Sequence, residues 1–162
     1  MGNASKLSVS ETLLAQIRHH AEATYPHECC GALLGRDAEP ESTQPVGERR
    51  AQASREVLRI FPMDNRNGDS PRNRFMVTGE DVRVAEAEAA QHGLEIVGWY
   101  HSHPDHPARP SEFDRDHAWP WYSYIIVSVR QRTAKELTAW RLGDDRQAFS
   151  EEGIEIRQHA AI

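Results

Sequence analysis

Residues 98–116 read GWYHSHPDHPARPSEFDRD and include His101, His103 and Asp114, whose side chains can bind a metal ion. His101 and His103 end an apolar run, and a strand there would place both imidazoles on the same face of a sheet. Ser111 and Asp114 have the Ser-x-x-Asp spacing of a helix start, where the serine caps free amides and the acid lies in the first turn. A Pro-rich loop joins the predicted strand to the predicted helix. It can therefore bring two histidines and one aspartate together.

Two imidazoles and one carboxylate are a ligand set that suits zinc. Three protein ligands leave the fourth tetrahedral position open for water, which is the arrangement of a catalytic zinc site. The sequence therefore predicts one Zn²⁺ ion per chain, bound by His101, His103 and Asp114. Three further histidines are alternative ligands by residue type: His27, His106 and His117.

The pattern His-x-His-Pro followed by Ser-x-x-Asp resembles the signature of the JAMM (MPN-plus) zinc metalloproteases, and the resemblance extends over roughly residues 10–142. In that family an upstream glutamate completes the site, and the matching segment PHECCGALLG, residues 26–35, offers Glu28. The resemblance implies that Glu28 carries protons as general base and acid, and that Ser111 hydrogen-bonds the oxyanion. It implies a zinc-dependent peptidase or isopeptidase that hydrolyses the bond after the C-terminal Gly-Gly of a ubiquitin-like protein.

The compact chain most resembles the small prokaryotic branch of that family, which acts on ubiquitin-like sulfur-carrier proteins. The resemblance leaves open whether such an enzyme trims a carrier tail, cuts isopeptide bonds or releases cysteine built on the carrier. RadC-type proteins, associated with DNA repair, share both motifs but usually carry Ser-Gly-Asp-Pro where this loop reads PDHP over residues 104–107. A non-catalytic MPN scaffold is the second alternative. Such modules have typically lost ligands that this sequence retains.

Composition narrows the class of protein. The chain has 162 residues, 38% of them hydrophobic, which is enough for one domain with its own core. A formal net charge of −6 disfavours a nucleic-acid partner. Cys29 and Cys30 are adjacent, and neighbouring cysteines rarely pair, so we expect no disulfide framework and a reducing cytoplasmic location. No apolar run is long enough to span a membrane, and the oligomeric state is left open.

The hydrophobic pattern predicts the other elements. We expect a helix capped by Ser8 and Glu11, a helix from Thr78 to Gly93, and strands over residues 29–34, 57–61, 75–77, 94–100, 122–129, 136–142 and within 147–156. This order predicts an α/β sandwich on one mixed sheet. The resemblance implies the same fold, a single-domain JAMM/MPN-like sandwich with a curved mixed β-sheet flanked by helices. We place the domain at residues 8–157, between a flexible leader (1–7) and a tail (158–162).

The polar segment of residues 62–73 lies about where JAMM enzymes carry an insertion that covers the substrate tail. It is rich in turn-forming residues and has almost no apolar side chain to anchor it, so it could pair with an extended tail by strand addition. Arg66, Arg72 and Arg74 are therefore candidate substrate-binding residues for an acidic carrier surface. The Trp119-Pro120-Trp121 triplet is interpreted as packing, with substrate contact as the alternative.

Overall fold

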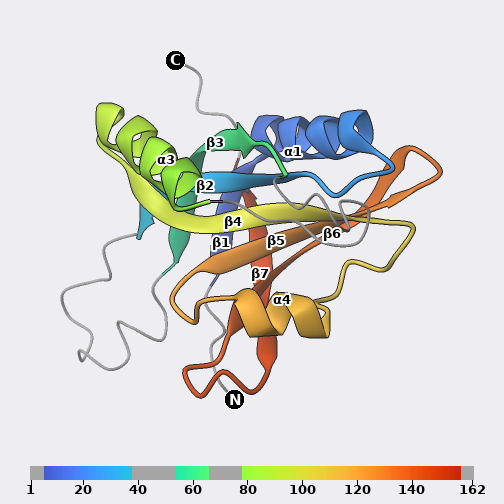
Figure 1. Ribbon diagram of the computed structural model, residues 1–162. Helices are drawn as coiled ribbons and strands as arrows, with labels where there is room; N and C mark the ends of the chain where they lie inside the picture. The colour runs from blue at the N-terminus through green and yellow to red at the C-terminus, as the bar shows by residue number, and fades with distance from the viewer. Residues whose placement is uncertain (1–5, 38–53, 66–77, 158–162) are drawn as a thin grey trace.

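The computed structural model describes residues 6–37, 54–65 and 78–157. Within them, seven strands and three helices form one mixed α/β unit, as Figure 1 shows. In chain order these elements are β1 Lys6–Ser10, α1 Glu11–Thr24, β2 Cys30–Asp37, β3 Arg55–Met63, α3 Gly79–Gln91, β4 Glu95–Pro104, α4 Glu112–His117, β5 Ser123–Arg130, β6 Thr133–Leu142 and β7 Phe149–Arg157. The predicted fold class is confirmed. No helix among the described residues is long and apolar enough to cross a membrane.

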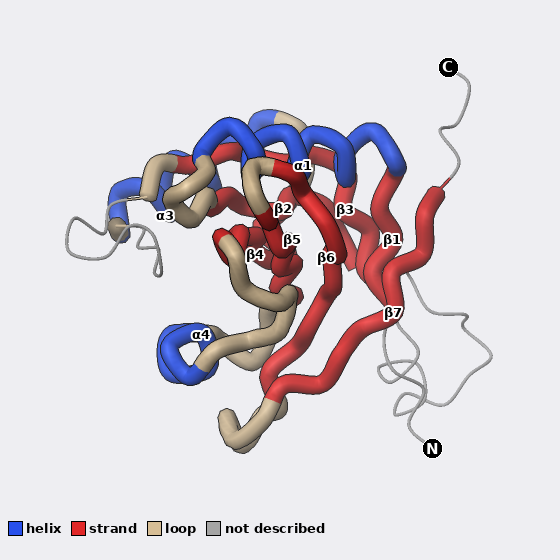
Figure 2. Tube along the Cα trace, turned by 90° about the vertical axis from the view of Figure 1, so that its right-hand side faces the viewer, coloured by secondary structure: helices blue, strands red, loops and turns tan. Residues whose placement is uncertain are grey.

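The sheet is mixed and closes on itself in the order β1-β3-β2-β4-β5-β6-β7. At its centre, β4 pairs antiparallel with β2 and parallel with β5. The short strand β1 closes the ring because it pairs in parallel with both β3 and β7. The curvature of the strands is plain in Figure 2. The strand that carries the two histidines therefore lies between two neighbours and is fixed on both edges.

Two apolar clusters lie on opposite faces of β2. Cys29, just before the strand, and Leu33 belong to the cluster that includes α1, whereas Cys30 and Leu34 belong to the cluster that includes α3. This alternation is the period of two expected for a strand buried on both faces. Both cysteines are free and buried, and they belong to the clusters on opposite faces of the sheet.

The start of the described chain differs from our prediction. Lys6 and Leu7, which we assigned to a leader, belong to β1, and Leu7 is fully buried. The predicted cap pair of Ser8 and Glu11 is wrong, because Ser8 lies in the strand and Ser10 caps α1 by accepting a hydrogen bond from the Leu13 amide at 3.2 Å. The side chains of Leu7 and Val9 both point into the core, as alternate residues of a strand do. This pattern covers too few residues to distinguish a strand from the segment that precedes a helix.

The strand β4 extends beyond the apolar run of residues 94–100 and includes both histidines, as the predicted strand alternation requires. His101 is paired with Cys30 of β2 and with Ile126 of β5, and His103 is paired with Ser128. Gly98 permits the close approach of β5, since a Cβ at this position would collide with the backbone carbonyl of Ser123. The histidines therefore project from a rigid central strand.

Three further predictions can be placed. The capping box of Thr78 and Asp81 at the start of α3 is confirmed, and the chain reverses after that helix at Gly93, which has a φ of 67°. One strand, β7, forms in the region where we expected one or two. The predicted strand over residues 75–77 lies outside the described residues.

Candidate metal centre and active site

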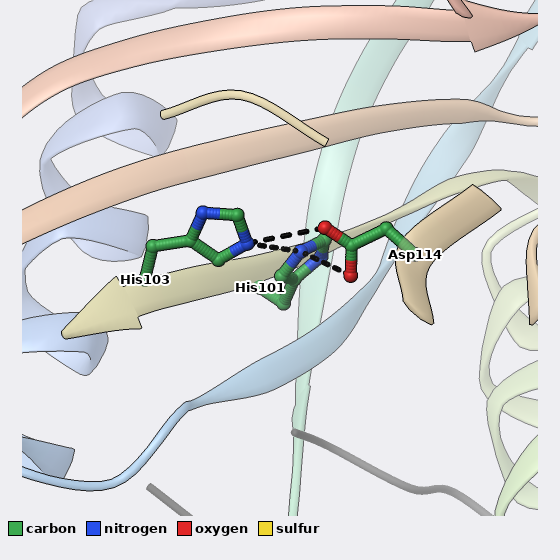
Figure 3. Close-up of side chains that lie close together, drawn as sticks. All are labelled: His101, His103 and Asp114. Atoms are coloured by element: carbon green, nitrogen blue, oxygen red, sulfur yellow. Dashed lines mark hydrogen bonds and ion pairs between the residues drawn. The ribbon is translucent and has the colours of Figure 1, made fainter. Parts of the chain in front are cut away.

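Three buried side chains converge where α4 faces β4 (Figure 3). The Nε2 atoms of His101 and His103 lie 3.2 Å apart. Each also faces one oxygen of Asp114, with Nε2–Oδ1 3.2 Å for His101 and Nε2–Oδ2 3.1 Å for His103. One candidate ligand atom from each residue lies within 4.8 Å of the other two. The structure thus brings together the three residues that we predicted as a metal site.

The start of α4 orients the aspartate. The Asp114 amide donates to Ser111 Oγ at 3.1 Å, and the Ser111 amide donates to Asp114 Oδ2 at 2.8 Å, so the predicted capping box is complete. Asp114 therefore caps the helix and faces the histidines at the same time. Ser111 is exposed beside this buried group, and its cap contact uses an oxygen lone pair rather than the hydroxyl hydrogen.

The loop between β4 and α4 orients His103. Its Nδ1 lies 2.8 Å from the Pro107 carbonyl, which can only accept, so in the neutral ring Nδ1 carries the proton and Nε2 keeps the lone pair that a metal can use. The loop is held in turn by β5, because the Asp105 amide donates to the Val129 carbonyl at 2.6 Å and Ser128 Oγ donates to the His106 carbonyl at 2.5 Å. A neutral imidazole held in this tautomer is what a metal ligand requires.

Glu28 is held next to the two histidines by a residue that sequence reasoning missed. The amide of Cys29 donates to Ser102 Oγ at 2.8 Å, and Ser102 lies between His101 and His103 on the opposite face of β4. Asn65 Nδ2 also donates to the Glu28 carbonyl at 3.1 Å, which gives the backbone at Glu28 a second contact. In a strand, the residue between two histidines points to the opposite face of the sheet. The sequence could therefore have predicted that Ser102 contacts a neighbouring segment of the chain and not the metal.

The carboxyl group of Glu28 is buried, with 3% of the residue exposed, and its Oε1 has no hydrogen-bond partner among the described residues. Burial raises the pKa of Glu28 to about 9, and the negative charge of Asp114 adds to the effect. Burial also works to raise the pKa of Asp114, but the charges and hydrogen bonds of His101 and His103 outweigh it and hold that pKa far below its ordinary value. The two carboxyl groups are therefore driven to opposite protonation states.

The donor set fits a zinc ion. Two imidazole nitrogens and a carboxylate oxygen converge on one point, and Nδ1 of His103 is already satisfied by a backbone carbonyl. The alternative ligands do not join them: His27 and His106 are exposed, and no metal-ligating group in the described chain includes them. His117 donates Nδ1–H to the Phe113 carbonyl at 2.8 Å and stacks on the Phe113 ring. Arg66, Arg72 and Arg74 lie outside the described residues.

The site can now be compared with known proteins. The sequence profile of the prokaryotic homologs of the JAB domain matches residues 10–143. This chain belongs to that family. The resemblance to the JAMM (MPN-plus) proteins that we drew from the two motifs is therefore confirmed.

Two relatives of this JAB-family chain cover most of its length. It is 34% identical over 143 residues to the desampylase of Haloferax volcanii, covering 83% of this chain and 90% of that protein. It is 36% identical to a protein from Salinibacter ruber with a known solution structure, with a TM-score of 0.67 over 98% of this chain and 94% of that one.

A third comparison supports the fold alone. The crystal structure of a JAB1/MPN domain protein from Archaeoglobus fulgidus matches with a TM-score of 0.52 and 18% sequence identity. The match covers 97% of this chain and 100% of that protein. The JAB/MPN fold is thus found both at moderate identity and at low identity.

Proposed function

We propose that this JAMM-family chain is a zinc-dependent peptidase or isopeptidase that hydrolyses the bond after the C-terminal Gly-Gly of a ubiquitin-like or sulfur-carrier protein. The observation that carries the proposal is the convergence of His101, His103 and Asp114 with the buried carboxyl group of Glu28 close by. Similarity to a protein named desampylase, over most of both chains, supports a hydrolase with a ubiquitin-like partner.

Each residue has a separate role in this proposal. Zinc bound by His101, His103 and Asp114 would supply Lewis-acid chemistry, polarising the scissile carbonyl and making water more acidic. Glu28 takes a proton from the attacking water and later gives it to the departing amine. The first transfer uses the carboxylate form of Glu28, and the second uses the protonated form, which burial favours.

Ser111 has a complementary role. Its Oγ accepts from the Asp114 amide, so the hydroxyl hydrogen is available to donate to the carbonyl oxygen of the substrate as that oxygen becomes negative. Because water attacks directly, no covalent intermediate with a protein side chain is required. The two alternatives, a RadC-like DNA-repair protein and a non-catalytic MPN scaffold, gain no support from a specific contact among the described residues.

The experiment is a cleavage assay on a ubiquitin-like carrier that ends in Gly-Gly. We would prepare the carrier with a short C-terminal peptide extension and, separately, with an isopeptide bond to a lysine, and identify products by mass spectrometry. Zinc content would be measured on the same enzyme. We expect cleavage after the second glycine, loss of activity with a chelator and recovery with zinc. An enzyme that contains one zinc per chain but leaves both substrates intact would refute the proposed reaction.

A matched control separates carrier recognition from general proteolysis. The same carrier with its last two residues changed from Gly-Gly to Ala-Ala keeps the extension and the fold but adds two side chains beside the scissile bond. We expect little or no cleavage of this control. Equal cleavage of the two carriers would show that the Gly-Gly requirement is wrong, even if the hydrolase chemistry is right.

A further inference from the structure

A mostly apolar pocket opens beside the metal centre. Its volume is about 260 Å³, and its lining includes His101 and Asp114 together with Trp99, Phe113 and Trp119. Figures 1 and 2 both show β4 passing between α3 and α4, and residues of all three elements contribute to the lining. Because two of the three candidate ligands form part of its wall, a group that fills this pocket lies next to the reacting bond.

The walls of this pocket are fixed by contacts within the protein. The rings of Phe113 and His117 are stacked with centroids 3.9 Å apart, and both line the pocket. The Trp119 amide donates to the hydroxyl of Tyr124 at 2.8 Å, which joins two further lining residues. A pocket whose walls are held in this way is preformed for a ligand rather than created by it.

Trp119 is 64% exposed, the largest exposed fraction among the exposed large hydrophobic side chains of the described chain. It lies at the rim of the pocket. An exposed aromatic side chain that lines an apolar pocket is placed to contact a ligand there. The packing interpretation of the Trp119-Pro120-Trp121 triplet is therefore incomplete for Trp119.

Under the proposed function, on which this inference rests, the acyl side of the scissile bond cannot fill the pocket. Its last two residues are glycines and have no side chains. The nearest side chain belongs to the leaving group, which follows the scissile bond directly. Aromatic and aliphatic lining favours an uncharged carbon chain over an acidic one, because a carboxylate would lose its hydration there.

We propose that this pocket binds the side chain that follows the Gly-Gly pair, and that it selects leaving amines with an apolar chain over those with an acidic chain. Trp99, Phe113 and Trp119 are then specificity-determining residues. Burial of a leucine-sized side chain corresponds to a preference of roughly tenfold or more in kcat/KM. The same pocket can take the methylene stem of a lysine or the short side chain of a cysteine.

The test uses two carriers that differ only in the residue after Gly-Gly, leucine in one and aspartate in the other. Gly79 lines the pocket, and a Cβ built on it meets no atom within 4 Å, so a larger side chain has room to enter without displacing backbone. The filling variant is Gly79→Phe, and Gly79→Ala is its matched control. Val82→Trp, one turn along α3 and also in the lining, is a second filling variant.

We expect the wild type and Gly79→Ala to prefer the leucine carrier by roughly tenfold or more. Gly79→Phe and Val82→Trp should lose most of that preference while binding zinc normally. Equal rates on the two carriers in the wild type, or filling variants that slow both carriers by the same factor, would overturn the pocket assignment. So would variants that change the preference for residues before Gly-Gly. Failure to cleave either carrier would instead refute the proposed function.

Discussion

Two buried polar groups in this protein differ in how completely their atoms are satisfied. The first is Arg55 in β3, which is 2% exposed. Its Nε donates to Asp37 Oδ1 at 2.8 Å, and its Nη1 donates to the carbonyl of Val97 at 2.9 Å, the carbonyl of Trp121 at 3.1 Å and Ser123 Oγ at 3.0 Å. The second is the metal centre with Glu28.

The metal centre is satisfied far less well by the protein itself. Two imidazole Nε2 atoms lie 3.2 Å apart, and Glu28 Oε1 has no partner among the described residues. Both Arg55 nitrogens named above lie within hydrogen-bond distance of an acceptor. This is typical of a buried charge that stabilises the fold. At the metal centre two imidazoles and two carboxyl groups lie close together, and a bound cation would stabilise this arrangement further. The difference separates a cluster that stabilises the fold from one that performs chemistry.

The largest effect should follow from removing a candidate ligand. His101→Ala, His103→Ala or Asp114→Ala leaves two protein ligands, which is too few to hold zinc tightly, and activity should disappear with the metal. His106→Ala is the matched control, because His106 lies in the same loop but is exposed and does not belong to the metal-ligating group. Zinc per chain by atomic emission checks this. Full zinc occupancy in any ligand variant would remove that residue from the site.

Glu28→Gln should separate chemistry from metal binding. The substitution retains shape and removes the proton carrier, so we expect zinc to remain and kcat to fall by about 10³-fold, because both proton transfers are lost. Single-turnover rates on a Gly-Gly carrier measure the loss. A rate close to that of the wild type would assign the base to another residue and weaken the contrast between the two buried clusters.

The Arg55 cluster should show the opposite behaviour. Arg55→Met removes the donor to Asp37 and to the carbonyls of Val97 and Trp121, whereas Ser123 Oγ keeps a contact with Arg141, so we expect the free energy of unfolding to fall by about 1–3 kcal/mol. Arg59→Met on the same strand is the control, since the Arg59 side chain is 48% exposed and makes a 3.5 Å contact with Glu88. Urea denaturation compares the two variants. Zinc stoichiometry of the folded Arg55→Met protein should be unchanged.

The two clusters also differ in how far the sequence predicts them. The ligands were predictable because strand alternation and a helix cap act over a few residues and fix where His101, His103 and Asp114 point. The partners of Arg55 lie close to it in space but far from it in the sequence, so no local sequence pattern predicts them. Closure of the sheet escaped prediction for the same reason, since it depends on β1 pairing with β3 and β7.

The smallest effect that we expect concerns Glu28 in the metal-free protein. Burial raises the pKa of Glu28 from an ordinary value of 4.5 to about 9, so between these values the folded state keeps a proton that the unfolded state has lost. The stability contributed by the neutral carboxyl is fully present below about pH 4.5. It is lost as the pH rises toward 9.

Glutamine cannot ionise, so Glu28→Gln should escape this loss. With zinc removed by a chelator, the variant should unfold at nearly the same urea concentration as the wild type at pH 5. At pH 8 it should be more stable, because the unfolded wild type gains stability when Glu28 ionises and the unfolded variant does not. Urea titrations of both proteins across this range give the comparison, and the Arg55 cluster is the same in each, so it cancels. If the difference between the two proteins stayed constant from pH 5 to pH 8, Glu28 would be ionised in the folded metal-free protein. The metal centre would then already satisfy its own charges, as the Arg55 cluster does.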